Sequence, residues 1–405
     1  MDKLLAVAAR TFALLFVLAP RAWAGDFVWQ HVGNGASPGT ASLNGFVFAL
    51  HADGNALYVG GSFTDAGGIA SADHIAKWNG STWSGFAPLN GDVLAIAFAG
   101  GKLIVGGTFT DASGNPDADF LARWNGSAWE PVCNAVGSAF NGNVNALQVI
   151  GSTLYVGGAF VGGAGIASAD HLLACDLTTG VASSTVDSVA HSLGGNIFAL
   201  TADNSGTLYA GGSAINIVAN PAIDYVGAYD GTWQAMGSGS GAGGGAIDSF
   251  VRALASDGTN VYVGTDAFDI AGIAQADNIA RWDGSGWHAM GGMADGYFTT
   301  PTVISAITIF GPLVFAGGSF QDASGNPLAD AVVYWDGSAW HAVGSDGAGN
   351  GPLSANAHVS AMATVGGRIF IGGTFTSAGS DTLASFIAQA PIAPIVVFID
   401  GFERN

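Results

Sequence analysis

Short apolar segments recur along this chain at a nearly constant distance from one another. Each combines alternating apolar residues with a terminal Gly-Gly pair, usually followed by a small residue and Phe, as in Leu57–Phe63. Seven copies occur, and in the fifth copy Thr265 replaces the second glycine. The first glycines of the copies are Gly60, Gly106, Gly157, Gly211, Gly264, Gly317 and Gly372. A repeat of about 50 residues made of strand-forming segments is typical of a β-propeller.

Repeat six shows how one unit is organised. Four apolar segments follow one another at Ile304–Ile309, Leu313–Phe320, Ala329–Trp335 and Trp340–Val343. The third and fourth are joined through Asp336-Gly337, a dipeptide that tolerates positive φ and favours a tight hairpin. The pattern therefore predicts a four-stranded antiparallel blade in each repeat.

The seventh repeat lacks its last segment. After the third strand expected at Ala384–Ala388, no Asp-Gly hairpin and no fourth strand follow. The missing segment is found near the N-terminus, where Trp29–Gly33 matches Trp340–Gly344. We therefore predict an all-β, seven-bladed β-propeller whose last blade is closed by the N-terminal strand, which leaves no outer edge unpaired.

Both ends of the chain differ from the repeats. Residues 1–24 combine Lys3 with a mostly apolar run and an Ala-Trp-Ala sequence before Gly25, which predicts a secretory signal peptide. The propeller is expected over residues 25–390 and a C-terminal tail over residues 391–405. An N-terminal membrane anchor is the alternative for the first segment, and a disordered end is the alternative for the tail.

The repeats also resemble known proteins. The Gly-Gly strand and the phrase Ile279–Trp287 are similar to kelch-type propeller repeats of secreted bacterial proteins and to the propeller of the Rax2 cell-polarity family. The resemblance covers roughly residues 27–390. It implies the propeller fold and a scaffold role. The segment Phe398–Glu403 resembles a short Phe-x-Asp-Gly-Phe-Glu tail of exported Gram-negative proteins, which implies a sorting or attachment signal.

The net charge of the chain limits the classes of molecule that it can bind. The 405-residue chain has a formal net charge of −20, which repels nucleic acid and anionic membranes. We expect a protein or carbohydrate ligand, a monomer, and no membrane insertion once the signal is removed. The expected location is outside the cell, on its surface or in the periplasm of a Gram-negative bacterium.

The chain contains two cysteines, Cys133 and Cys175, in neighbouring repeats. In an exported protein they could pair as a disulfide, and they could equally remain free thiols. No Cys-x-x-Cys or Cys/His spacing suggests a zinc site.

Acidic residues gather in the loops between second and third strands. An aspartate precedes the third strand in six repeats, with Ser385 in the seventh: Asp73, Asp119, Asp170, Asp224, Asp277 and Asp330. Two loops share Asp-Ala-Ser-Gly-Asn-Pro, beginning at Asp111 and Asp322. Carboxylates and loop carbonyls suit calcium, so Asp111, Asp119, Asp322 and Asp330 are candidate Ca²⁺ ligands. The alternative is structural: each carboxylate accepts hydrogen bonds from its own loop as an Asx turn.

Catalytic motifs have little support in the sequence. No His-Glu-x-x-His occurs, and Glu130 and Glu403 are the only glutamates. The one formal match to Gly-x-Ser-x-Gly, Gly35–Gly39, stands in a Gly- and Pro-containing stretch without the strand–turn–helix context of a nucleophile elbow. His74 and His171 stand at a strand position whose occupant varies between repeats, and the recurring Trp pairs are expected to pack between blades. We therefore expect a non-enzymatic binding or surface-interaction scaffold that uses its acidic long-loop face and needs no cofactor apart from the candidate Ca²⁺. The alternative is a secreted glycan-active enzyme with catalytic aspartates on that face.

Overall fold

The computed structural model describes residues 27–133, 140–186, 193–239, 244–291, 297–298 and 302–392. The signal peptide predicted for residues 1–24 lies outside the described residues, as does most of the predicted tail. In the described part of the chain, no helix has the length and apolarity to cross a bilayer.

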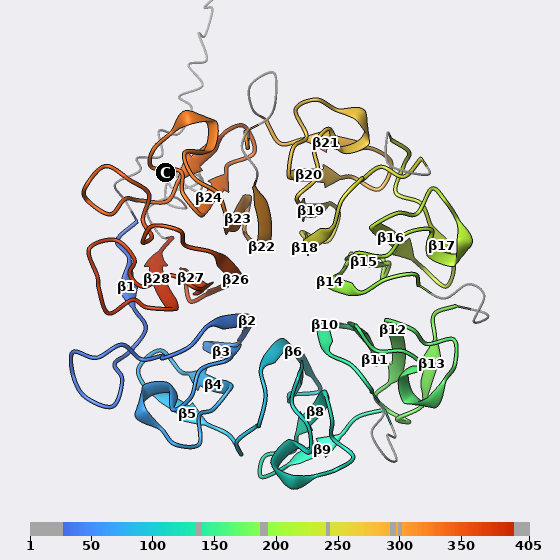
Figure 1. The fold of residues 1–405 in the computed structure, drawn as a ribbon, viewed down its shortest axis with the longest axis horizontal. Helices are drawn as coiled ribbons and strands as arrows, with labels where there is room; N and C mark the ends of the chain where they lie inside the picture. Colours follow the sequence, from blue (N-terminus) through green and yellow to red (C-terminus); the bar gives the residue numbers. More distant parts are fainter. Residues whose placement is uncertain are drawn as a thin grey trace, which may run out of the picture.

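Seven four-stranded antiparallel sheets form a ring, which confirms the predicted seven-bladed propeller (Figure 1). Blade 1 contains β2 (Val47–Asp53), β3 (Ala56–Gly61), β4 (Ile75–Trp78) and β5 (Trp83–Gly85). Blade 2 contains β6 (Val93–Ala99), β7 (Lys102–Gly107), β8 (Leu121–Trp124) and β9 (Trp129–Pro131). Blade 3 contains β10 (Val144–Ile150), β11 (Thr153–Gly158), β12 (Leu172–Asp176) and β13 (Ala182–Ser184).

The remaining blades follow the same order. Blade 4 contains β14 (Ile197–Ala202), β15 (Leu208–Gly212), β16 (Val226–Tyr229) and β17 (Trp233–Gln234). Blade 5 contains β18 (Val251–Ser256), β19 (Val261–Thr265), β20 (Ile279–Trp282) and β21 (Trp287–Ala289). Blade 6 contains β22 (Val303–Phe310), β23 (Leu313–Ser319), β24 (Val332–Trp335) and β25 (Trp340–Ala342). Blade 7 contains β26 (Val359–Val365), β27 (Arg368–Gly373), β28 (Ile387–Pro391) and β1 (Gln30–His31).

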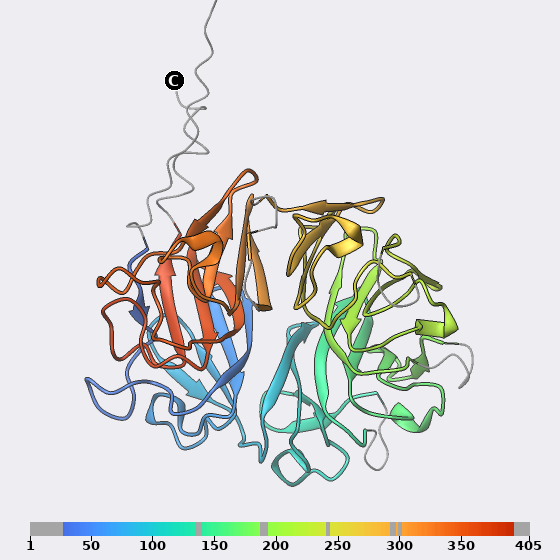
Figure 2. The same ribbon diagram turned by 45° about the horizontal axis from the view of Figure 1, so that its top comes forward.

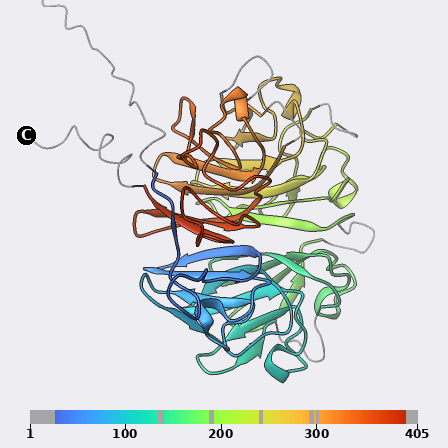
Figure 3. The same cartoon turned by 60° about the vertical axis from the view of Figure 1, so that its left-hand side comes forward.

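The N-terminal strand closes the ring as predicted. β1 pairs antiparallel with β28, with Gln30 opposite Gln389 and His31 opposite Ala388. Figure 3 shows the first described residues running along the outer edge of the last blade. The predicted boundary at residue 390 is slightly short of the last strand, because β28 includes Pro391 and the Ile392 N–H donates to the Gly367 carbonyl.

The innermost strand of every blade carries a β-bulge at its start. In blade 1 the register shifts between Val47 and Ala49, so Phe48 has no partner across the ladder. The other six blades shift at the same point, leaving Leu94, Asn145, Phe198, Arg252, Ser305 and Ser360 as the bulged residues. A bulge redirects one side chain and increases the local twist. Each blade therefore presents one variable residue near the axis of the ring.

The first glycine of each repeat allows neighbouring blades to approach closely. A Cβ on Gly60 would lie 2.6 Å from Cγ1 of Val93, the first residue of the next innermost strand. The same clash with a β-branched residue of the following blade would arise at each first glycine, including Gly372 against Val47 across the closure. The repeated glycine is thus required by packing between blades.

Tryptophans of the fourth strands tie the blades together, as the sequence interpretation expected. The indole N–H of Trp83 donates to the Val32 carbonyl at 3.0 Å, and that of Trp129 to Ala87 at 2.8 Å. The same bond to the preceding blade is made by Trp29, Trp287 and Trp340, whereas Nε1 of Trp233 in blade 4 is buried without a partner in the described structure. Buried indole N–H groups need such partners, so each bond both satisfies the donor and fixes the blade spacing.

Blade 3 lacks this tryptophan and has a disulfide at the same junction. Cys133 and Cys175 are bonded, with Cα atoms 5.5 Å apart. The strand register places Cys175 opposite Ala182, where the other blades pair Trp78 with Trp83 or an equivalent. Cys175 thus holds the position of Trp78, and Ala174 holds that of Lys77.

The partner cysteine also replaces a packing residue. Cys133 follows β9 with φ 66°, as Gly33 follows β1 with φ 68°. A Cβ on Gly33 would lie 2.6 Å from the Trp78 ring of the next blade. At the junction of blades 2 and 3, a disulfide therefore replaces the contact between a small residue and a tryptophan.

The close approach of blades predicts an effect of one methyl group. Gly60→Ala should destabilise the protein by about 1–3 kcal/mol because the added carbon overpacks against Val93. Gly286→Ala is the matched control, since its Cβ would meet no atom within 4 Å and its φ is ordinary. Denaturant unfolding of both variants checks this, and equal stabilities would contradict the packing argument.

The disulfide should be replaceable by the interaction found at other junctions. Cys133→Ala with Cys175→Ala should lose about 2–4 kcal/mol of stability relative to the oxidised protein. The triple variant Cys133→Gly, Cys175→Trp, Ala182→Trp should recover much of this loss and become insensitive to reductant. Unfolding curves with and without dithiothreitol measure both effects. A triple variant no more stable than the double alanine variant would refute the equivalence.

Candidate functional site

The two faces of the ring carry different connections. The turns between first and second and between third and fourth strands lie on one face, and the longer second-to-third loops and blade crossings lie on the other (Figure 2). We call the latter the long-loop face. In six blades its loop contains a short 3₁₀ turn: η1 (Ala66–Gly68), η2 (Ala112–Gly114), η3 (Gly163–Gly165), η5 (Ile217–Ala219), η6 (Ile270–Gly272) and η7 (Ala323–Gly325).

The recurring aspartates hold these loops closed. Oδ1 of Asp73 accepts the backbone N–H of Asp65 at 2.8 Å, and Oδ1 of Asp224 accepts that of Asn216 at 2.7 Å. Asp119, Asp170, Asp277 and Asp330 each bind the N–H eight residues earlier in the same way. The prediction that each carboxylate accepts a hydrogen bond from its own loop is confirmed. The predicted Asx turn is wrong, because the bond joins residues eight positions apart, at the two ends of the loop. In blade 7 the Ser385 hydroxyl instead donates to the Thr376 carbonyl.

The four candidate calcium ligands belong to two such loops. Asp119 binds the Asp111 N–H at 2.6 Å and Asp330 binds the Asp322 N–H at 2.7 Å, so one carboxylate of each pair already serves the loop. Asp111 and Asp322 are exposed and adopt φ 48°, a conformation that aspartate tolerates. Over the described ranges, no three His, Cys, Asp or Glu side chains gather around a common point.

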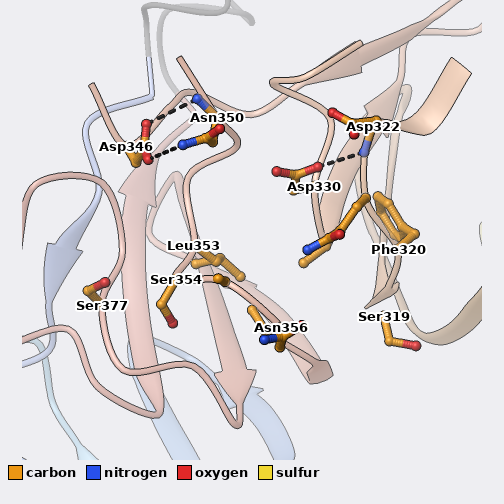
Figure 4. Close-up of a pocket in the computed structure, with 14 residues that line it drawn as sticks. Ser319, Phe320, Asp322, Asp330, Asp346, Asn350, Leu353, Ser354, Asn356 and Ser377 are labelled. Atoms are coloured by element: carbon orange, nitrogen blue, oxygen red, sulfur yellow. Dashed lines mark hydrogen bonds between the residues drawn. The ribbon is translucent and has the colours of Figure 1, made fainter. Parts of the chain in front are cut away.

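An open pocket of about 840 Å³ lies on the long-loop face between blades 6 and 7. One wall is the loop from Ser319 to Ala331, and the opposite wall is the blade crossing from Asp346 to Ala357, with Ser377 beside it. Figure 4 shows Asp322 and Asp330 on one side of this pocket and Asp346 with Asn350 on the other. Two of the four candidate metal ligands therefore line the pocket, and Asp111 and Asp119 do not.

Hydrogen bonds fix the orientation of the pocket carboxylates. Asp330 accepts the Gly351 N–H on Oδ2 at 3.1 Å as well as the Asp322 N–H, so it joins the two walls. The Asn350 side-chain amide and the Ala348 N–H bond to Asp346 and hold the pKa of its carboxyl below its ordinary value. No Lys or Arg is among the lining residues. The pocket thus offers fixed anionic and amide groups beside the buried Phe320 and Leu353.

The histidines are spread over the molecule. His288 and His341 bond through Nε2 to Asp283 and Asp336 at 2.6 and 2.8 Å. Both pairs belong to hairpins between third and fourth strands, on the face opposite the long-loop face. Burial lowers the pKa of His171, and the His74 ring lies 3.5 Å from Asp92. None of these four histidines hydrogen-bonds to a hydroxyl or thiol within the described residues. A fifth, His358, has its Nε2 2.9 Å from the Ser305 hydroxyl.

Sequence reasoning found the face but missed part of the pocket. Asp346, Asn350 and Asn356 lie in a blade crossing that is long in the sequence, and its length was the signal. The crossing after blade 4 approaches its own loop in the same way, since a Cβ on Gly245 would lie 2.9 Å from that of Asp224, as one on Gly351 would lie 2.5 Å from that of Asp330. Nothing in the strand pattern indicates these contacts, because they join segments outside the strands.

Comparisons identify the fold alone. No protein-family model and no curated protein matches this chain. The extracellular domain of a putative one-component system from B. thetaiotaomicron matches with TM-score 0.55 and 12% identity, over 89% of this chain and 39% of that chain. A GH74 xyloglucanase from Xanthomonas campestris matches with TM-score 0.52 and 11% identity, over 87% of this chain and 52% of that chain. YCF48 bound to D1 peptide matches with TM-score 0.50 and 11% identity, over 91% and 96%. These identities are too low to indicate a shared activity.

Calcium can be tested by thermal unfolding. With Asp119 and Asp330 committed to their loops, we expect millimolar Ca²⁺ to leave the melting temperature unchanged. Asp119→Ala should cost about 1 kcal/mol through the lost bond to the Asp111 N–H, and Asp111→Asn should cost little. A rise of several degrees with Ca²⁺, abolished by Asp111→Asn and Asp322→Asn, would support the calcium hypothesis instead, since ligand binding to the native state raises its stability.

Proposed function

We propose that this protein is an exported, non-enzymatic β-propeller that binds a protein or glycan ligand through its long-loop face. The observation that carries the proposal is the pocket between blades 6 and 7, where two long segments hold carboxylates and amides in fixed positions. Rigid scaffolds commonly place binding groups on such loops. The kelch-like or Rax2-like relationship remains an expectation consistent with a scaffold role.

Export is supported by two features. The residues before Gly25 have the composition of a signal peptide, and the Cys133–Cys175 disulfide suits an oxidising compartment. These features support the proposed location outside the cell, on its surface or in the periplasm, and the C-terminal segment Phe398–Glu403 is proposed as the attachment or sorting signal.

The best-defined carboxylate of the pocket suits binding. Hydrogen bonds from the Asn350 side chain and the Ala348 N–H lower the pKa of the Asp346 carboxyl, so this group is ionised. An ionised carboxylate held in place suits the recognition of hydroxyls, amides and cations.

A paired substitution tests the proposal. The whole protein is applied to an array of neutral oligosaccharides, amino-sugar oligosaccharides and basic peptides, and we expect binding that Asp322→Arg weakens by about tenfold or more. Asp65→Arg is the control, because Asp65 holds the same loop position and backbone conformation in blade 1, away from the pocket. Equal effects of the two substitutions would place the ligand elsewhere. Release of reducing ends from xyloglucan, lost on substitution of Asp322, would favour the enzyme alternative.

A further inference from the structure

Aligning the blades by their strand register reveals one loop position that changes character around the ring. The position is the third residue after the Gly-Gly pair of each repeat, or after Gly264-Thr265 in blade 5, and it is exposed in all seven blades. Blades 1, 2, 6 and 7 carry polar residues there, and blades 3, 4 and 5 carry large apolar ones: Thr64, Thr110, Val161, Ile215, Phe268, Gln321 and Thr376. Because the position is solvated everywhere, packing does not explain three consecutive apolar residues.

Exposed apolar side chains concentrate on the same part of the long-loop face. Of the seven large hydrophobic residues exposed in the described chain, four are Val161, Ile215, Phe250 and Phe268, which are 40–55% exposed. We call these four residues the apolar arc. Phe250 immediately precedes β18 and its carbonyl accepts the Thr265 hydroxyl at 2.8 Å, which places it beside the loop that carries Phe268. Apolar residues gathered on one surface are typical of interaction sites.

Polar groups unique to blade 5 border the arc. Arg252 is the bulged residue of β18, and its guanidinium lies 5.4 Å from the Phe250 ring and 5.8 Å from the Phe198 ring. Asp266 stands where other blades have Ser, Thr or Ala. The Arg252–Asp266 distance is 3.6 Å, too long for a hydrogen bond.

Both groups retain unused hydrogen-bonding capacity. Nε of Arg252 and Oδ1 of Asp266 are buried within the described structure without a partner, and the two side chains as a whole are 37% and 27% exposed. The exposed guanidinium and carboxylate atoms can therefore bond to a ligand that supplies one acceptor and one donor. A peptide group supplies both, through its carbonyl oxygen and its N–H.

Charge around the arc indicates the sign of the partner. Asp248 and Asp269 are exposed next to Phe250 and Phe268 in the chain. Burial raises the pKa of the Tyr225 phenol, and the nearby carboxylates of Asp224, Asp248 and Asp266 raise it further. Among the described residues, Arg252 is the single Lys or Arg in the loops and strand starts of this face, the others lying in second or third strands. Basic side chains therefore complement the surroundings of the arc.

We propose that the apolar arc docks an extended segment of a partner protein that carries apolar and basic side chains. Phe250 and its neighbours bury the apolar side chains, Arg252 and Asp266 bind a backbone carbonyl and N–H, and Asp248 and Asp269 attract the basic ones. Val161 and Ile215 lack a ring on which a sugar could stack, which favours a polypeptide over a glycan. The inference rests on the proposed function only in taking the long-loop face as the binding face.

The experiment uses the whole protein and a phage-displayed library of random linear peptides. We expect selected sequences to be enriched in apolar residues with Lys or Arg. The triple variant Val161→Thr, Ile215→Thr, Phe268→Thr should bind a selected synthetic peptide about tenfold or more weakly. It introduces the residue that blades 1, 2 and 7 already carry, so its fold should be retained, which thermal unfolding checks. Val181→Thr is the control, because Val181 is an apolar residue that is 59% exposed in a hairpin of the opposite face.

Each other outcome overturns the inference. Selection of acidic peptides, of no peptides, or of peptides unaffected by the triple variant would exclude a basic apolar segment at the arc. Oligosaccharide binding that the triple variant abolishes would assign the arc to a glycan. Peptide binding lost in Asp322→Arg but not in the triple variant would overturn this inference while leaving the proposed function intact.

Discussion

The close approach of each blade to the next is the constraint on which the rest of this structure depends. A strand of one blade can lie against the first β-branched residue of its neighbour only where it has no side chain, as at Gly60 against Val93 and Gly372 against Val47. Because interiors are packed to a fixed density, these contacts set the spacing and tilt of all seven blades. The tryptophan bonds and the pairing of β1 with β28 then secure a geometry that the glycines permit.

The junction of blades 2 and 3 shows that residues in contact across a junction differ together from those at the other junctions. A small residue faces a tryptophan at other junctions, and here Cys133 faces Cys175 across the same space. The disulfide also links residues 42 positions apart in the sequence, which restricts the unfolded chain. One junction of the ring therefore relies on covalent chemistry where five others rely on packing and an indole hydrogen bond.

The long-loop face combines a constant framework with variable contacts. Aspartates such as Asp73 and Asp330 clamp each loop from within, so the exposed residues of that loop can change without loss of its shape. Blades 6 and 7 use this freedom to build an acidic pocket, and blades 3 to 5 use it to expose apolar residues. Two chemically different regions on one rigid face suit the binding role proposed for this protein.

By itself, the sequence determined the number of blades, the order of their strands and the closure by Trp29–Gly33. These features follow from local periodicity and from repeated residues, both of which are readable along the chain. Tertiary structure decided which residues meet: the loop-spanning bonds of the aspartates, the place of Cys175 in a tryptophan position, and the pocket formed by the crossing near Asn350. The physical reason is that these contacts join segments from different blades, or opposite ends of one loop, whose distances are set only when the ring closes.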